Sequence, residues 1–323
     1  MHVLIVGGAG YIGSHVAKAF LDRNHRVTVY DNLSSGLREN LLPASGFVHG
    51  DIQDELKLRD LMTSAEIDAV VHLAAFKAAG ESMIVPEKYS HNNIAGTISL
   101  LNAMIHAGVS RIVFSSSAAV YGEPEYLPVD EEHPTRPENF YGFTKLEIER
   151  LLHWYSSLKG VRYAALRYFN AAGYDPEGII TGLEQNPANL LPVIMEVAVG
   201  KRKELQIFGD DYPTEDGTGV RDYIHVTDLA VAHVLAMEHI EAKAEDLTVN
   251  LGSESGISVQ EMVDVARRVT GEKIPAKTVA RRPGDPARLV ASAGLARKLL
   301  GWKAEYSDVE TLIATSWRAY RPS

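Results

Sequence analysis

The sequence predicts an α/β protein in which a doubly wound parallel sheet is followed by a smaller α/β lobe. Over the first 170 residues, short and continuously apolar runs alternate with helical segments, as parallel strands buried on both faces require. A glycine-rich turn joins the first apolar run to the first helical segment. After residue 169, clusters of Gly, Pro, Asn and Asp break this rhythm, which indicates a second and less regular lobe.

The first half is expected to hold strands that alternate with helices. Apolar runs predict strands at residues 3–6, 27–30, 47–49, 69–74, 111–115 and 164–168. Helices are expected at residues 11–22, 88–107 and 142–158, with others in the remaining gaps. Because helices separate the strands, the sheet is predicted to be parallel, with helices on both faces.

The second half, residues 171–323, is predicted to be a substrate-holding lobe. Its boundary is not sharp, because such lobes often lend elements back to the main sheet. Strand signals lie at residues 205–208 and 247–250, and helices are expected at about 190–199, 227–238 and 258–269. Ser258 with Glu261, and Ser307 with Glu310, match the capping-box pattern and predict two helix starts.

Composition excludes several classes of function. The 323 residues include no cysteine, which removes disulfides, cysteine-bound zinc, iron–sulfur clusters and thiolate catalysis. A formal net charge of −10 and the lack of a basic stripe argue against non-specific nucleic-acid binding. No apolar run reaches the ~18 residues of a membrane span, and no basic leader precedes the first strand, so a soluble cytoplasmic protein is expected. His15, His72 and His225 lack metal-ligand spacing, so they are expected to pack in the core, and no metal is expected.

Three glycines in the first turn predict a dinucleotide site. Gly7, Gly10 and Gly13 stand between a strand and a helix, where small residues allow the backbone and the helix N-terminus to approach a pyrophosphate. Asp31 follows Gly13 by 18 residues at the end of the next strand. A carboxylate there accepts ribose hydroxyls and repels a 2′-phosphate, so NAD is favoured over NADP. The alternative is a glycine-rich turn beside a solvated aspartate. Asp51 is predicted to contact adenine or to cap a helix.

Three further residues suggest acid–base chemistry on an alcohol. Ser117 closes the strand predicted at 111–115, at the sheet edge where open α/β sheets bind ligands. Tyr141 and Lys145 follow, four residues apart on one helix face. A nearby ammonium and an oxidised nicotinamide would favour the phenolate of Tyr141, which could then accept an alcohol proton while Ser117 holds the same hydroxyl. In isolation the Tyr–Lys pair would be read as a surface pair.

These motifs resemble the extended short-chain dehydrogenase/reductase family. The resemblance is carried by the glycine turn, Ser117, Tyr141-x-x-x-Lys145 and the Arg167-Tyr168-Phe169-Asn170 run, and it covers essentially the whole chain. The carrying segments are residues 7–15, 77–82, 114–122 and 209–226, of which the last is the most specific because it lies in the substrate lobe. The resemblance implies a Rossmann-type NAD-binding domain over residues 1–170.

The implied reaction is reversible inversion at C4 of a UDP-hexose, between UDP-glucose and UDP-galactose, through a transient 4-keto sugar and tightly bound NAD. The implied NAD contacts come from both the glycine turn and later loops: Gly7, Gly10, Tyr11, Ile12, Gly13, Asp31, Asn32, Leu33, Ser34, Ser35, Gly36, Asp51, Ile52, Leu73, Ala74, Ala75, Lys77, Asn92, Ser117, Tyr141, Lys145 and Phe169. The implied UDP-sugar contacts are Lys77, Ser117, Tyr141, Asn170, Asn189, Leu190, Gln206, Ile207, Phe208, Arg221, Arg282, Asp285 and Leu289. Arginines suit a pyrophosphate because their fork of donors binds two oxygens at once.

Other functions on the same fold remain open. A nucleotide-sugar 4,6-dehydratase or decarboxylating enzyme would need an acid–base pair just after the serine, where this chain has Ala118 and Ala119. A simple dehydrogenase and a non-enzymatic NAD-sensing or scaffold protein are further alternatives. Leu289 stands where some relatives carry a tyrosine and more permissive ones a smaller residue, so partial acceptance of UDP-N-acetylglucosamine is a hypothesis. Helices 88–107 and 142–158 could pair with their copies in a homodimer, as in relatives.

Overall fold

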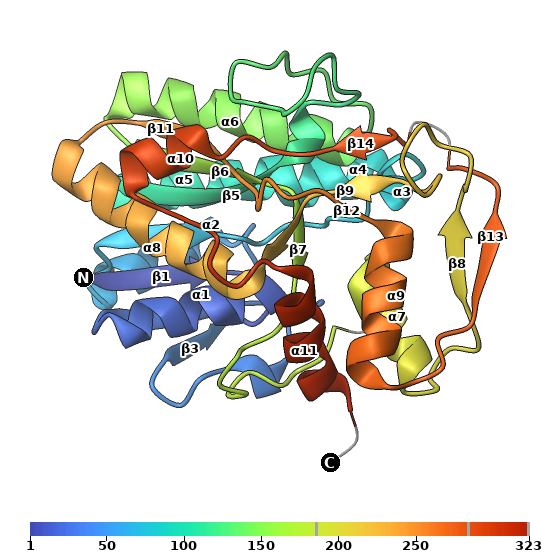
Figure 1. Ribbon diagram of the computed structural model, residues 1–323. Helices are drawn as coiled ribbons and strands as arrows, with labels where there is room; N and C mark the ends of the chain where they lie inside the picture. Colours follow the sequence, from blue (N-terminus) through green and yellow to red (C-terminus); the bar gives the residue numbers. More distant parts are fainter. Residues whose placement is uncertain (185–186, 283–284, 322–323) are drawn as a thin grey trace.

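The computed structural model describes residues 1–184, 187–282 and 285–321 and has the predicted α/β architecture (Figure 1). Its centre is a seven-stranded sheet in the order β11-β6-β5-β4-β1-β2-β3, in which all strand pairs are parallel. The strands are β1 (His2–Val6), β2 (Arg26–Asp31), β3 (Gly46–His49), β4 (Ala69–His72), β5 (Arg111–Ser117), β6 (Arg162–Tyr168) and β11 (Leu247–Leu251). Every strand predicted in the first half is present.

Alternate side chains of each central strand pack into two separate apolar cores, because successive side chains of a strand point to opposite faces of the sheet. On β1, Val3 and Ile5 pack into one core, and Leu4 and Val6 pack into the other. The first core is covered by α1 (Tyr11–Asp22), α8 (Val226–Lys243) and α10 (Gly294–Leu300), and the second by α2 (Glu55–Ser64), α5 (Gly96–Ala107) and α6 (Phe140–Lys159). This is the three-layer arrangement that the strand–helix alternation predicts.

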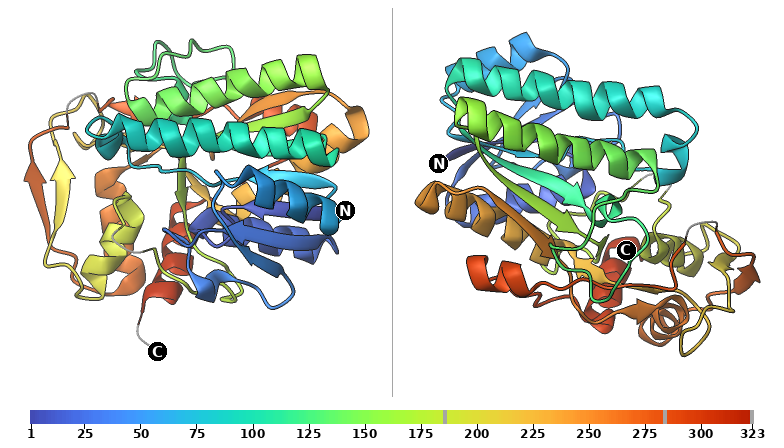
Figure 2. Two further views of the ribbon diagram at one scale, coloured as in Figure 1. Left: turned by 180° about the vertical axis from the view of Figure 1, so that it is seen from behind. Right: turned by 90° about the horizontal axis from the view of Figure 1, so that it is seen from above.

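The helix predicted at residues 88–107 begins slightly earlier and contains a wider turn. It runs from α4 (Pro86–Tyr89) through a π-helical stretch, η2 (Ser90–Ala95), into α5. Figure 2 shows this long helix beside α6 on the outer surface of the molecule. A π-helical turn shifts the facing of the residues within it, and such turns often occur at functional sites.

The second half forms a smaller lobe around its own apolar core. The lobe contains three small sheets: β7 (Asn170–Ala172) with β10 (Tyr223–His225), β8 (Leu205–Phe208) with β13 (Ala276–Val279), and β9 (Val220–Arg221) between β12 (Ile257–Ser258) and β14 (Arg288–Leu289). The helices α7 (Leu190–Ala198), α9 (Val259–Thr270) and α11 (Val309–Tyr320) pack over them. The remaining short elements are η1 (Arg38–Asn40), α3 (Ala79–Ser82) and η3 (Ala118–Val120).

Two elements from the second half belong physically to the central sheet. Strand β11 pairs with β6 at the sheet edge, and α8 packs against α1, β5 and β6. Residues 226–251 therefore lie on the main sheet although they follow lobe segments in the sequence. A division of the chain at residue 170 stays a prediction about domains.

The two predicted capping boxes have different outcomes. The Ser258 side chain accepts a hydrogen bond from the Glu261 amide, 3.0 Å away, and so caps α9 as predicted. The expectation for Ser307 is wrong, because Asp308 caps α11. The Ser307 hydroxyl instead donates to the Asp228 carboxylate at 2.6 Å and accepts from the His225 amide at 2.8 Å. The Ser307 hydroxyl therefore bonds with buried residues from distant segments and does not cap the helix that follows it.

The three core histidines are buried and hydrogen-bonded, as predicted. Burial lowers the pKa of His15 to about 4 and the pKa values of His72 and His225 to about 3, so each ring is neutral at pH 7. His225 caps α8 by accepting from the Thr227 amide. Within the described parts of the chain, no helix has the length and apolar character needed to cross a membrane.

Candidate functional site

The predicted cofactor and catalytic residues meet at the carboxyl edge of the central sheet. The glycine turn follows β1, Asp31 ends β2, Asp51 follows β3, and residues 73–77 follow β4. Ser117 ends β5 and Phe169 follows β6. Because the carboxyl ends of parallel strands share one edge, six segments that are far apart in the sequence converge there.

The turn between β1 and α1 has the close backbone packing that a bound pyrophosphate requires. A Cβ atom on Gly7, whose φ is +89°, would lie 2.6 Å from the Ala74 amide nitrogen, and one on Gly13 would lie 2.2 Å from the Gly7 carbonyl oxygen. No side chain caps α1, and its first turn carries no acidic residue. The positive end of the helix dipole is therefore open to an anion, and the turn fits a dinucleotide.

Carboxylates at the ends of β2 and β3 fit the nucleoside part of NAD. Asp31 is buried and accepts from the amides of Ala9 at 3.0 Å and Leu33 at 2.8 Å, which fixes its orientation. Each of its oxygens keeps a second lone pair for a ribose hydroxyl. Asp51 accepts from the Asn32 side chain at 2.9 Å, and it is Asp54 that caps α2. These contacts favour the ligand-binding interpretation of Asp51 over the capping one.

Lys77 lies where two halves of the chain face each other. Its ammonium forms an ion pair with the carboxylate of Glu184, which belongs to the loop between β7 and α7. The lysine side chain is about half exposed, so its charge is accessible to a phosphate. Asn92 lies within the π-helical stretch η2, next to the buried Asn93 whose side chain accepts from the Phe76 amide.

The start of α6 places Tyr141 against the end of β5. The Asn139 side chain caps this helix by accepting from the Gly142 amide at 2.8 Å. A Cβ atom at Gly142 would lie only 2.3 Å from the Ala119 carbonyl oxygen, so glycine allows the helix to touch η3. As a result the Tyr141 phenol lies near the Ser117 hydroxyl, which acts to lower the pKa of the phenol.

Lys145 lies one turn further along α6 and is buried. Its ammonium donates to the Ser115 carbonyl oxygen at 2.8 Å and lies 5.8 Å from the centre of the Tyr141 ring. Burial lowers the pKa of Lys145 to about 7, while the carboxylate of Glu149 raises it. Burial also raises the pKa of Tyr141, and the hydrogen bond from Ser117 lowers it. In the protein chain alone burial therefore outweighs any stabilisation of the phenolate, and a bound cation is needed to favour it.

A cavity of about 760 Å³ opens between β8, β9 and α7, and its wall includes Asn170, the residue after Phe169. It includes most of the residues predicted to bind a UDP-sugar, namely Asn170, Asn189, Leu190, Gln206, Phe208, Arg221, Arg282 and Asp285. The Arg282 guanidinium stacks 3.8 Å from the centre of the Phe208 ring, and Arg221 donates to Asp285. Two arginines and an aromatic ring suit a nucleoside diphosphate.

Five predicted substrate residues do not line this cavity: Lys77, Ser117, Tyr141, Ile207 and Leu289. Ile207 points to the opposite face of β8 from Gln206, and its side chain is buried in the core of the lobe. Leu289 packs against a buried apolar cluster that includes Ala118, Leu146 and Phe169.

The structure adds residues to this wall that sequence reasoning missed. Tyr212, Tyr223 and Arg202 line the same cavity. Tyr212 and Tyr223 belong to the segment 209–226, whose specificity was noted from the sequence, but nothing in the pattern distinguishes a lining tyrosine from a core one. Arg202 lies in a surface turn after α7, where a basic residue gives no local signal of ligand contact.

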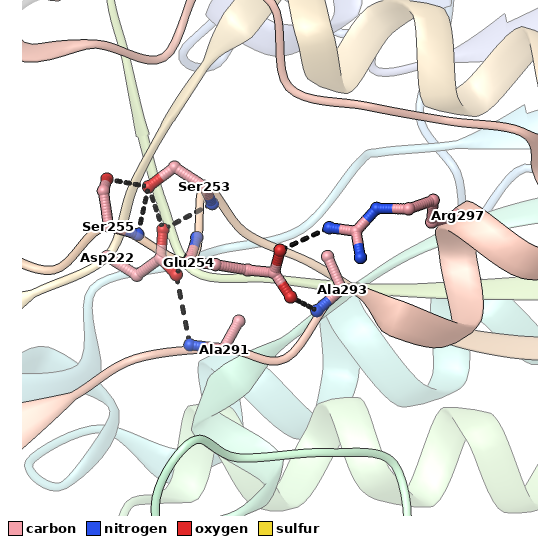
Figure 3. Close-up of polar contacts among 7 residues, drawn as sticks. All are labelled: Asp222, Ser253, Glu254, Ser255, Ala291, Ala293 and Arg297. Carbon is pink, nitrogen blue, oxygen red and sulfur yellow. Dashed lines mark hydrogen bonds and ion pairs between the residues drawn. The ribbon is translucent and has the colours of Figure 1, made fainter.

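Asp222, which follows the cavity residue Arg221, joins several segments through its hydrogen bonds (Figure 3). Its buried carboxylate accepts from the Ser253 amide and hydroxyl and from the amides of Glu254 and Ala291, at 2.7–3.1 Å. Its backbone amide donates to Leu289 and its carbonyl oxygen accepts from the Asn170 side chain. The residue thus joins β9, β14 and β7 beside Arg221.

A Rossmann-type sheet with these groups at its carboxyl edge, and a second lobe beside it, defines the protein as a short-chain dehydrogenase/reductase of the extended type. The chain belongs to the NAD dependent epimerase/dehydratase family, whose sequence model matches residues 3–252.

Individual relatives match over nearly the full length. A UDP-glucose 4-epimerase of Halalkalibacterium halodurans is 47% identical over 322 residues, which are 99% of this chain and 96% of that protein. The crystal structure of UDP-glucose 4-epimerase from Brucella ovis in complex with NAD is 45% identical, has a TM-score of 0.96, and aligns over 99% of this chain and 98% of its own. The corresponding structure from Bifidobacterium longum, in complex with NAD⁺ and UDP, is 39% identical with a TM-score of 0.92 over 99% and 98%.

The Asp222 arrangement predicts a selective loss of nucleotide binding. Replacing Asp222→Ala removes the shared acceptor of four donors, of which the Ala291 amide is buried, and loosens the segments beside Arg221. UDP should therefore bind about tenfold more weakly, since such groups contribute about 1–3 kcal/mol. Isothermal titration with UDP measures this, and the exposed Asp210→Ala serves as the control. Equal UDP affinity in the wild type and the folded Asp222→Ala variant would contradict the proposed support.

Proposed function

We propose that this protein interconverts UDP-glucose and UDP-galactose by inverting C4 of the sugar, with NAD held throughout the reaction, as a step of galactose metabolism. The observation that carries the proposal is the combination of the Ser117–Tyr141 pair with a cavity whose wall begins at Asn170, directly after Phe169, and presents Arg221 and Arg282. The names and ligands of the full-length relatives support the same substrate and cofactor.

The cofactor would be held by the glycine turn, Asp31, Asp51 and Lys77. When bound, NAD supplies a reversible two-electron oxidation of the substrate carbinol, which a protein without redox-active side chains cannot perform itself. Such oxidation is needed because the hydrogen on C4 of a hexose has no neighbouring carbonyl and is not acidic. A base alone therefore cannot invert that carbon.

The protein's side chains remove the proton from the C4 oxygen and later return it. The Tyr141 phenolate accepts the hydroxyl proton, and Ser117 holds the same oxygen through its hydroxyl. Lys145 places a positive charge beside the phenol and is itself fixed by the Ser115 carbonyl. After the 4-keto sugar turns its other face to the site, Tyr141 returns the proton to the oxygen.

The turning of the sugar needs a firm hold on UDP and a loose hold on the hexose. Arg221 and Arg282 provide charged donors for the diphosphate, and Phe208 and Tyr212 add aromatic surface to the same cavity. The hexose, in contrast, would lie towards Leu289, which packs against a buried apolar cluster that includes Ala118, Leu146 and Phe169. Apolar neighbours give no directional bonds that would fix one sugar face.

The dehydratase alternative lacks its catalysts in this structure. Ala118 and Ala119 occupy η3 directly after Ser117, and the Ser117 hydroxyl accepts from the Ala119 amide at 3.1 Å. Methyl groups cannot transfer the protons that elimination from C5 and C6 requires. This favours inversion at C4 over elimination.

We also propose that the protein forms a homodimer through α5 and α6. Along α6, Phe143, Trp154 and Leu158 are exposed on one face, and Trp154 and Leu158 expose 60% and 70% of their surface. Met83 and Ile84, before α4, are exposed as well. Large apolar groups gathered beside two parallel helices favour a four-helix interface with a second copy. A cytoplasmic location likewise stays a prediction.

The activity is tested on the protein as purified. Denaturation should release NAD without prior addition of cofactor, and UDP-galactose should be converted to UDP-glucose. Deuterium at C4 of the substrate should remain at C4 of the product, because the hydrogen returns to the carbon it left. Loss of the label to water, or protein without dinucleotide that ignores added NAD, would overturn the proposal.

Tyr141→Phe should give a folded protein that retains NAD but loses most of its turnover, about 10²–10⁴-fold as expected for removal of an acid–base group. Circular dichroism and the released NAD serve as controls for folding and binding. A near-normal rate in this variant would remove Tyr141 from the role of base.

Leu289 generates a prediction about the size of the sugar. The wild type should convert UDP-N-acetylgalactosamine at a reduced but measurable rate, and Leu289→Tyr should abolish this conversion while retaining activity on UDP-galactose. The larger ring fills space beside Phe169 that an N-acetyl group would need. No product from UDP-N-acetylgalactosamine with an active wild type would contradict this.

Light scattering after size exclusion should give a mass of twice the 35.4 kDa chain. Trp154→Glu should shift it towards one chain, because a charge would be buried without a partner. The matched change Leu299→Glu, at an exposed apolar position on α10, should leave the dimer intact. A wild type that elutes and scatters as a single chain would contradict the dimer.

A further inference from the structure

We propose that Glu149 is a positioning residue of the site: with Arg167 it fixes the serine-rich end of β5 against α6 and supplies the negative charge that keeps Lys145 cationic. This inference rests on the proposed function, because it assigns a role towards the same Tyr141–Lys145 pair. It adds a residue that lies one further helical turn along α6, behind Lys145, on the side away from the substrate.

The Glu149 carboxylate is buried and fully bonded. The Ser116 hydroxyl donates to it at 2.5 Å. The Arg167 guanidinium donates to both carboxylate oxygens at 2.6–3.3 Å. Both charged residues expose 8% of their surface or less. A buried ion pair is costly to form unless its geometry is good, and removing one partner leaves an uncompensated charge.

Three consecutive serines of β5 each contact a different residue of α6. The Ser115 carbonyl oxygen accepts from Lys145, the Ser116 hydroxyl donates to Glu149, and Ser117 turns its hydroxyl towards Tyr141. Lys145 and Glu149 are one helical turn apart on α6. Two adjacent bonds between α6 and β5 therefore fix the distance at which Tyr141 meets Ser117.

The network continues away from the substrate into the edge strand. Arg167 donates to the Tyr121 hydroxyl at 3.0 Å, and Tyr121 donates to the Asn250 side chain of β11 at 2.6 Å. The Glu131 carboxylate accepts from the Asn250 amide at 2.7 Å. The pair thus joins α6 to β5, β6 and β11, with no exposed charge of its own.

Among the residues that the structure describes, Glu149 is the anion that counteracts the burial of Lys145. On α6 its neighbours are the neutral Tyr141 and the anionic Glu149. From β4, His72 faces it as a neutral ring, and from β6, the neutral Tyr168 bonds with Ser115. From α8, His233 is neutral and bonds with the Ser115 hydroxyl.

Charge near the ammonium therefore depends on the Glu149–Arg167 pair. Burial lowers the pKa of Lys145 to about 7, and Glu149 is the one group that raises it. Without this carboxylate the pKa of Lys145 falls further below its usual value, and Arg167 is left as an unpaired cation. The ammonium is then lost at a lower pH, and the phenolate of Tyr141 loses the positive charge beside it.

The test compares the wild type with Glu149→Gln, which keeps the shape and removes the charge. We expect kcat for UDP-galactose to fall about tenfold or more at pH 8 with KM within about twofold. The acid limb of the kcat profile should move to higher pH, since Tyr141 is harder to ionise, and the alkaline limb to lower pH, since Lys145 deprotonates earlier.

A second readout does not depend on turnover. In protein labelled with ¹³C-lysine, the Cε shift of Lys145, assigned with Lys145→Met, reports its titration directly. Its midpoint should fall by about one pH unit or more in Glu149→Gln, where one unit corresponds to a tenfold change in the ratio of charged to neutral form. Glu149→Asp keeps the charge but retracts it, so its midpoint should lie between the other two and keep the comparison possible if Glu149→Gln is unstable.

Glu131→Gln is the matched control. It removes another half-buried carboxylate of the same network, on the side away from Lys145. Its kcat profile and its Lys145 midpoint should remain those of the wild type. A Glu131 variant that shifts both as much as the Glu149 variants would overturn the assignment of the effect to Glu149.

The outcomes separate this inference from the proposed function. Equal Lys145 midpoints in the wild type, Glu149→Asp and Glu149→Gln would overturn the electrostatic role, even if activity falls. A lowered midpoint with an inactive wild type would support the role of Glu149 and reject the proposed function. A lowered midpoint of the Lys145 titration in the Glu149 variants, together with a kcat profile that is narrower in pH, supports both the role of Glu149 and the proposed function.

Discussion

A positive charge buried at the carboxyl edge of a parallel sheet is the constraint on which the rest of the site depends. The ammonium of Lys145 is buried, so the protein compensates it with the Ser115 carbonyl and the carboxylate of Glu149. That carboxylate in turn needs Arg167, and Arg167 draws Tyr121 and Asn250 into the same network. One buried charge thus requires polar partners on four elements, α6, β5, β6 and β11. Each of these buried polar groups would destabilise the fold if it had no partner.

The two halves of the site are held by different kinds of interaction. On the cofactor side, backbone geometry dominates, since Gly7 and Gly13 allow contacts that no side chain would tolerate. On the substrate side, buried side chains position the wall, with Asp222 joining β9 to β7 and β14. A backbone-built turn is rigid and suits a cofactor that is retained. A wall joined through side-chain hydrogen bonds suits a sugar that has to turn within it.

Local patterns made the cofactor turn and the Ser117, Tyr141 and Lys145 group predictable. Each depends on a short spacing between a strand and a helix, which the sequence displays directly. Ser307 shows the limit of such reasoning, because its predicted capping role was replaced by bonds to Asp228 and His225, about 80 residues away. Ile207 shows another limit, since the resemblance implied substrate contacts at residues 206, 207 and 208 but did not indicate which face of β8 the substrate would contact.

The sequence by itself determined the parallel sheet, the glycine turn, the helical spacing of Tyr141 and Lys145, and the family, because these depend on periodicity and on residues close together in the chain. Only the tertiary structure decided that β11 and α8 return to the sheet, that Asp222 supports the cavity, and that Glu149 lies behind Lys145. Those contacts join residues up to more than 100 positions apart. Their partners are selected by burial, which forces polar groups from distant segments to satisfy one another.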